Sequence, residues 1–95
     1  MTPQLPSLEL LESTHQFPGQ FTFKVIGDSR ADFTEDALKS TVLALGETRE
    51  ISHSSRTSSA GNHIAVTISV HVKSSHEVHA VYRNLLGINA IRALF

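Results

Sequence analysis

The sequence predicts an α+β fold in which helices cover one face of a single antiparallel sheet. His63 to Val72 alternates aliphatic residues with small or polar ones, which is the period of a half-buried strand. Two other stretches repeat apolar residues at spacings of three and four, as amphipathic helices do. The 95 residues suffice for one core between two layers.

The composition is that of an ordinary globular chain, with 40% hydrophobic and 18% charged residues. Eight Lys and Arg residues balance nine Asp and Glu residues and never form a run, so we expect neither nucleic acid nor membrane as a partner. No stretch reaches the roughly 20 apolar residues of a membrane span. The N-terminal region lacks the pattern of a signal peptide, and we therefore expect a cytoplasmic protein.

Residues 1–19 are expected to form an N-terminal arm, and residues 20–95 a single domain. Ser7 is placed to cap a short turn, and Phe17-Pro18-Gly19 then forces an extended or turning path into the domain. The arm is either an ordered flap over the core or a peptide that binds a partner. Its apolar anchors would be Leu8, Leu11 and Phe17.

A strand and then a helix are predicted after the arm. The strand spans about six residues up to Gly27, because polar residues separate the apolar residues Phe21, Phe23 and Val25. The helix follows Asp32, which with Glu35 resembles a capping box, and it ends at Gly46. Its apolar stripe comprises Phe33, Ala37, Leu38, Val42 and Leu45.

A β-hairpin is predicted next. Thr48 to Ser58 is extended and polar, with Ile51 as its only large aliphatic residue, which is typical of an edge strand. A turn centred on Ala60-Gly61 would pair Ile51 with Val70 on the buried side. The same register turns His53 inward, so a bulge or a longer loop is an equally good prediction.

The C-terminal part predicts a second helix and a last strand. Ser74 and Glu77 form a capping box, Gly87 closes the helix, and its apolar stripe comprises Val78, Val81, Tyr82 and Leu85. Ile88 to Phe95 is expected to be a strand whose shared face carries Ile91, Ala93 and Phe95. The order βαββαβ is that of the ferredoxin-like plait, with a four-stranded antiparallel sheet of order 4-1-3-2 and two helices on one face.

Six histidines raise the question of a metal site. His76 and His79 lie three apart on the second helix, and His71 precedes it. A site needs at least three converging ligands, and neither Cys nor an evident carboxylate completes this set. We therefore expect no metal and no cofactor, and no motif identifies catalytic residues.

The loop before the first helix is the candidate ligand site, because free N–H groups at a helix N-terminus attract anions. Its residues are Gly27, Asp28, Ser29 and Arg30, and Arg30 is the cation that would meet a carboxylate. The open face of the sheet is predicted to lack the stacking aromatics of an RNA-binding sheet. It is either solvated surface or a homodimer contact, and it carries Thr22, Lys24, Thr67, Ser69 and His71.

Three stretches of the chain carry a family resemblance: Phe17-Pro18 with Phe21 to Gly27, Ser58 to Asn62, and Leu85 to Arg92. With them the chain resembles the YbeD-like family of small bacterial proteins of unknown function. It departs from the family at His63, where an aromatic residue is expected, and from Glu47 to Arg56. The resemblance implies a plait close to the ACT domains, which sense small molecules such as amino acids, and an indirect link to lipoate metabolism.

The leading hypothesis is a non-catalytic, ACT-like regulatory or binding module. It would associate with a second copy or another protein through a sheet edge or the open face, and would take a small molecule beside Gly27 to Asp32. One alternative is a small hydrolase or isomerase with His71 as the base. Another is that the arm docks onto a larger partner.

Overall fold

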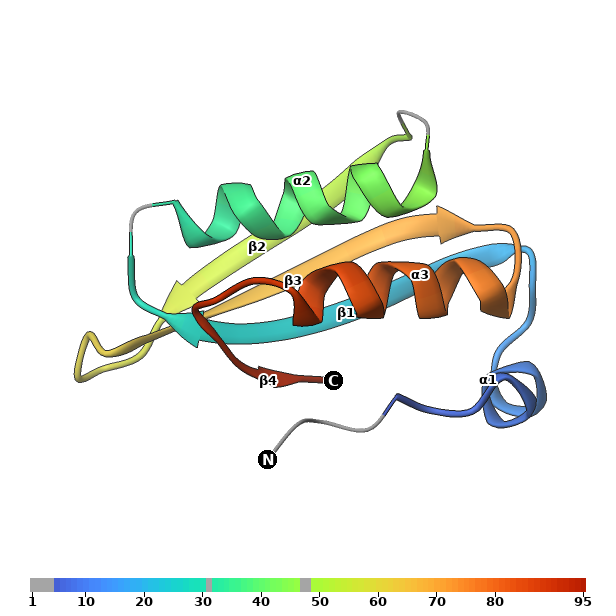
Figure 1. Ribbon diagram of the computed structural model, residues 1–95, viewed down its shortest axis with the longest axis horizontal. Coiled ribbons are helices and arrows are strands. Elements are labelled where there is room, and N and C mark those ends of the chain that lie inside the picture. The colour runs from blue at the N-terminus through green and yellow to red at the C-terminus, as the bar shows by residue number, and fades with distance from the viewer. Residues whose placement is uncertain (1–4, 31, 47–48) are drawn as a thin grey trace.

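The computed structural model describes residues 5–30, 32–46 and 49–95. The elements in chain order are α1 (Leu8–Thr14), β1 (Gly19–Asp28), α2 (Phe33–Leu45), β2 (Ile51–Thr57), β3 (His63–Val72), α3 (Ser75–Leu86) and β4 (Ile91–Leu94). The strands form one antiparallel sheet in the order β2-β3-β1-β4, with α2 and α3 side by side on one face (Figure 1). The predicted α+β plait and its strand order are therefore confirmed. None of the described helices has both the length and the apolar character needed to cross a membrane.

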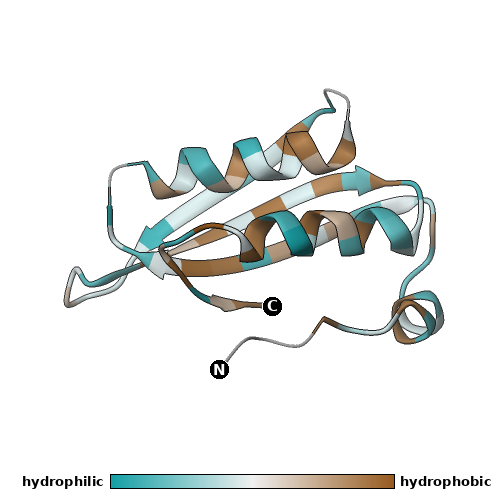
Figure 2. Cartoon of the chain, viewed as in Figure 1, coloured by the Kyte–Doolittle hydropathy of each residue, from teal (hydrophilic) through white to brown (hydrophobic). Residues whose placement is uncertain are grey.

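The central pair of strands, β1 and β3, builds the floor of the core. Val66, Ile68, Val70 and Val72 are fully buried, whereas the residues between them are half-buried or exposed, as the alternation predicts. Hydrophobic and hydrophilic positions alternate along β3 in Figure 2. The helices close the core from one side with Phe33, Ala37, Val78, Val81 and Leu85.

β1 is longer than predicted, because it pairs with β3 along all of Gly19–Asp28. β2 is shorter: it spans Ile51–Thr57, and Thr48 lies outside the described residues. Ile51 pairs with Val70, which confirms the hairpin register, and the pairing runs without a bulge. His53 is exposed, as are all the residues of Ser52–Thr57.

The helix ends agree with the sequence at three places and differ at one. Asp32 makes no side-chain capping bond to α2, so the predicted capping box is wrong there. Its carboxylate lies 3.1 Å from Nε of Arg30 instead. Gly46 ends α2 with a φ of 72°, a conformation that favours glycine. Ser74 caps α3 by accepting a hydrogen bond from the Glu77 amide, and Gly87 closes that helix.

β4 corrects the prediction for the last strand. The register shifts where β4 meets Ile26 and Gly27, so Ala93 pairs with Ile26 and Ile91 pairs with Gly27. Consequently Leu94, and not Ala93, shares the core side with Ile91. The 64% exposed Phe95 exchanges two backbone hydrogen bonds with Lys24. It thereby brings an aromatic ring to the open face, which was predicted to have none.

The arm folds against the domain. The Ser7 hydroxyl accepts a hydrogen bond from the amide of Leu10 at 3.0 Å, which confirms the predicted cap. The helix α1 contacts α3, where the hydroxyl of Ser75 donates to the Glu12 carboxylate at 2.7 Å. Of the three expected anchors, Leu11 is buried, with 3% of its surface exposed, whereas Leu8 and Phe17 are half-buried.

Candidate functional site

The predicted ligand loop uses its side chains within the fold. A Cβ atom on Gly27 would lie 2.2 Å from the ring of Phe33, so the glycine lets the first residue of α2 pack against β1. The Asp28 carboxylate accepts hydrogen bonds from Arg92 at 2.7 and 3.2 Å. This contact holds the pKa of Asp28 below its usual range.

Arg30, the cation expected to meet a ligand, faces two carboxylates. Its Nε lies 3.1 Å from Asp32 and its Nη2 lies 2.6 Å from Asp36. The Ser29 amide donates to the carbonyl of Asn62 at 3.1 Å. The loop is therefore tied to the first turn of α2 and to the β2–β3 turn.

The residues predicted for the open face do lie together on the sheet surface away from the helices. Thr22 and Ser69 are cross-strand partners whose hydroxyl oxygens are 3.0 Å apart. Lys24 and Thr67 are also cross-strand partners. The exposed His71 is the cross-strand partner of Gln20. The side chains of these three cross-strand pairs are all polar.

A hollow of about 700 Å³ lies at the other end of the same face. Its lining residues are Ile26, Arg56, Thr57, Ser58, Ser59, His63, Ala65 and Arg92. Four residues form one row across the sheet in the order Arg56, Ala65, Ile26, Ala93, because each pairs with the next. The hollow therefore has an apolar floor. Arg56 from β2 and Arg92 from β4 line it from the two edges of the sheet.

The residues of this hollow are not among those predicted from the sequence. The alternation of β2 and β3 places Arg56 and His63 on the open face, so the hairpin register contained the signal for both. Arg92 could not be placed in this way, since the irregular pairing of β4 breaks the alternation.

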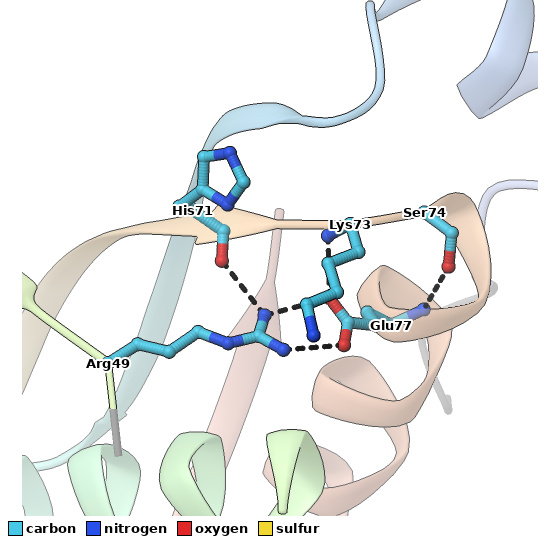
Figure 3. A network of polar contacts seen from close by, with 5 residues as sticks. All are labelled: Arg49, His71, Lys73, Ser74 and Glu77. Atoms are coloured by element: carbon cyan, nitrogen blue, oxygen red, sulfur yellow. Dashed lines mark hydrogen bonds and ion pairs between the residues drawn. The ribbon is translucent and has the colours of Figure 1, made fainter. Parts of the chain in front are cut away.

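A second polar network joins β3, α3 and the segment before β2 (Figure 3). Arg49 donates two hydrogen bonds to the Glu77 carboxylate, at 2.8 and 2.7 Å, and a third to the carbonyl of His71 at 3.0 Å. The Lys73 amide donates to Glu77 at 2.6 Å. Chiefly because of the hydrogen bonds from Arg49, the pKa of Glu77 falls to about 2.

His71, the histidine considered as a catalytic base, takes part in this network through its backbone alone. Figure 3 shows its ring pointing away from Arg49 and Glu77. On the second helix, His79 contacts the carbonyl of Pro6 through Nε2, and His76 is exposed. Within residues 5–30, 32–46 and 49–95, no three His, Asp or Glu side chains gather as metal ligands would.

Comparison with known proteins identifies a family. The family described as Protein of unknown function (DUF493) matches residues 12–94. A UPF0250 protein of Shewanella sp. (strain ANA-3) is 34% identical over 77 residues, which cover 81% of this chain and 85% of the relative. A UPF0250 protein of Shewanella loihica is 30% identical over 76 residues, or 80% of this chain and 84% of the relative.

A solved structure shares the fold. The solution structure of protein HP0495 from H. pylori superimposes with a TM-score of 0.65 and covers 98% of this chain and 97% of its own. Its sequence identity is 12%, so the likeness concerns the fold alone. The sequence matches and the shared plait agree with the motifs described above, and the chain belongs to the DUF493 family of proteins of unknown function, the YbeD-like family that those motifs predict.

Proposed function

We propose that the protein is a non-catalytic binding module that associates with a second copy of itself through the free edge of β2. The observation that carries this proposal is the exposure of that edge: every residue of Ser52–Thr57 is exposed. Such a strand presents a row of unpaired backbone groups that another strand can pair with. The module would then regulate by binding, without chemistry of its own.

The pairing pattern identifies which backbone groups are available. The Ser58 amide donates to the carbonyl of His63 at 2.8 Å, so these two residues form a hydrogen-bonded pair. Because bonded and non-bonded pairs alternate in an antiparallel ladder, Ser54 and Arg56 also direct their backbone groups toward β3. His53 and Ser55 consequently direct their N–H and C=O groups outward, to the free edge.

The two edges of the sheet differ in how well they resist pairing. β4 has four residues and an irregular register, and both features discourage strand addition. β2 has seven residues, a regular register, no proline and no lysine. Arg56 is its one charged residue, so its sequence carries few of the devices that keep an edge monomeric.

A second copy is the partner that this edge fits best. Two identical antiparallel strands are related by a two-fold axis, so each outward group meets its complement without any further surface being required. The four-stranded sheet would become continuous across the axis. This geometry also leaves both open faces uncovered.

The experiment measures mass in solution by light scattering over a concentration series. We expect a species of twice the 10.4 kDa chain mass that dissociates on dilution. Ser55→Pro removes an outward N–H group and spares the ladder to β3, so this variant should be a folded monomer. Ser55→Ala is the matched control and should still associate.

Circular dichroism would establish that both variants are folded. The proposal fails if the wild-type chain is monomeric at millimolar concentration. It also fails if folded Ser55→Pro associates as strongly as Ser55→Ala, because association would then use another surface.

A further inference from the structure

We infer that the hollow on the open face is a binding site for a small molecule with a single carboxylate and a short apolar body. This inference goes beyond self-association through β2, since the hollow lies on the face of the sheet and the association uses its edge. Three features carry it: the apolar floor, the cations at its margins and the Asp28 carboxylate that one of these cations contacts.

The floor departs from the rest of the open face. Ala65, Ile26 and Ala93 are adjacent in one cross-strand row, and all three are half-buried. In the next row Lys24 and Thr67 are polar, and Phe95, which pairs with Lys24, adds an exposed aromatic ring at the β4 end. A few carbon atoms laid along the row would be removed from water, which is favourable in proportion to the apolar area covered.

Arg56 supplies a cation at the β2 end of the row. It is exposed, and within the described part of the chain its side chain has no hydrogen-bond or ion-pair partner. Its β3 partner is Ala65, so the guanidinium group stands beside the floor. A guanidinium group offers two parallel N–H donors that match the two oxygens of a carboxylate.

Arg92 and His63 complete the margin. Arg92 uses Nε and Nη2 for Asp28, and the remaining guanidinium N–H groups are donors beyond that ion pair. His63 is the cross-strand partner of Asp28. The two arginines thus outweigh one acidic residue around the hollow, a balance that suits a single negative charge. A dianionic phosphate would experience more repulsion from Asp28.

Hexanoate is a suitable probe, with ¹⁵N-labelled protein followed by NMR. We expect saturable shifts that centre on the amides of Ile26, Ala65 and Arg56. Acetate lacks the apolar body, and hexanol and hexylamine lack the negative charge, so each should bind roughly tenfold more weakly or not at all. These comparisons separate the contribution of the floor from that of the cations.

Arg56→Gln is the decisive variant, and we expect it to weaken hexanoate binding by about tenfold. Arg83→Gln, on the exposed surface of α3, is the matched control and should leave binding unchanged. The inference is overturned if hexanoate gives no saturable shifts, if hexanol binds equally well, or if Arg56→Gln has no effect. The Ser55→Pro variant, which is expected to be monomeric, should bind hexanoate as the wild-type chain does. Its titration therefore tests the site independently of self-association.

Discussion

Glu77 joins three parts of the molecule through one carboxylate. Its carboxylate accepts hydrogen bonds from the Arg49 guanidinium group, in the segment before β2, and from the Lys73 amide, just after β3. Its own amide donates to the hydroxyl of Ser74, which caps α3. The side chains of Arg49 and Glu77 are 11% and 22% exposed, so water screens this ion pair less than it screens a surface pair. The pair therefore ties the segment before β2 to the junction between β3 and α3.

The low pKa of Glu77 predicts how stability depends on pH. The ionised form is favoured in the folded state, so its contribution is complete above the ordinary value of 4.5 and is lost as pH falls toward about 2. Glu77→Gln should lower the free energy of unfolding near neutral pH by about 1–3 kcal/mol. It should also flatten the decline in acid. Urea unfolding at a series of pH values measures both effects.

Glu35 provides the control for this prediction. Its ion pair with Lys39 joins side chains that are 66% and 67% exposed, so Glu35→Gln should change stability by no more than about 0.5 kcal/mol. Equal effects of Glu35→Gln and Glu77→Gln would show that the Arg49 pair contributes no more than a surface pair.

At the scale of elements, α1 depends on the domain for its order. Its seven residues are too few for a stable isolated helix, so the helix must be held by contacts with α3. Leu11 makes the main apolar contact, being 3% exposed, whereas its neighbour Leu10 is 52% exposed.

These two leucines provide a matched test of the arm. Leu11→Ala should destabilise the whole domain by about 2–4 kcal/mol, because it opens a cavity between α1 and the core. Leu10→Ala should cost less than about 0.5 kcal/mol, since its side chain is largely in water. Thermal unfolding of the two variants measures the difference. If Leu11→Ala proves harmless, the arm is not part of the folded unit and a partner-binding role for it gains support.

The elements that sequence reasoning predicted are those whose signals are local. Alternation along β3, the Ser74 cap and the glycine after α2 each act within a few residues, and the structure confirms them. Asp32 misled because Arg30, two residues away, competes for its carboxylate. The irregular register of β4 depends on its pairing with β1, which nothing in the local pattern reveals.

The candidate sites also depend on contacts between segments that are distant in the sequence, which local patterns do not reveal. Arg56 and Arg92 are far apart in the sequence and line one hollow because pairing through β3 and β1 brings β2 and β4 into the same sheet. The loop from Gly27 to Arg30 looked available as a sequence, but its charged side chains find partners in α2 and in the segment that includes β4. Such long-range pairings are set by the tertiary structure and leave no signal in the local sequence.

At the scale of the whole molecule, the fold is a two-layer structure with its core on one side of the sheet. Val66 is fully buried beneath the helices, while the adjacent Thr67 faces the other way and is half-buried. Self-association through β2 leaves this arrangement intact, since it extends the sheet without covering its open face. Substitutions along β3 should therefore lower the free energy of unfolding at every second position, where the side chain faces the helices.

Alanine substitutions along β3 test this one-sided architecture. Val66→Ala and Ile68→Ala remove buried atoms from the core and should lower the free energy of unfolding by about 1.5–4 kcal/mol. Thr67→Ala and Ser69→Ala alter the open face and should cost less than about 1 kcal/mol each. Urea unfolding of the four variants gives the comparison. Equal costs on both faces would mean that a second layer covers the open face, and the hollow would then be an interface instead of a ligand site.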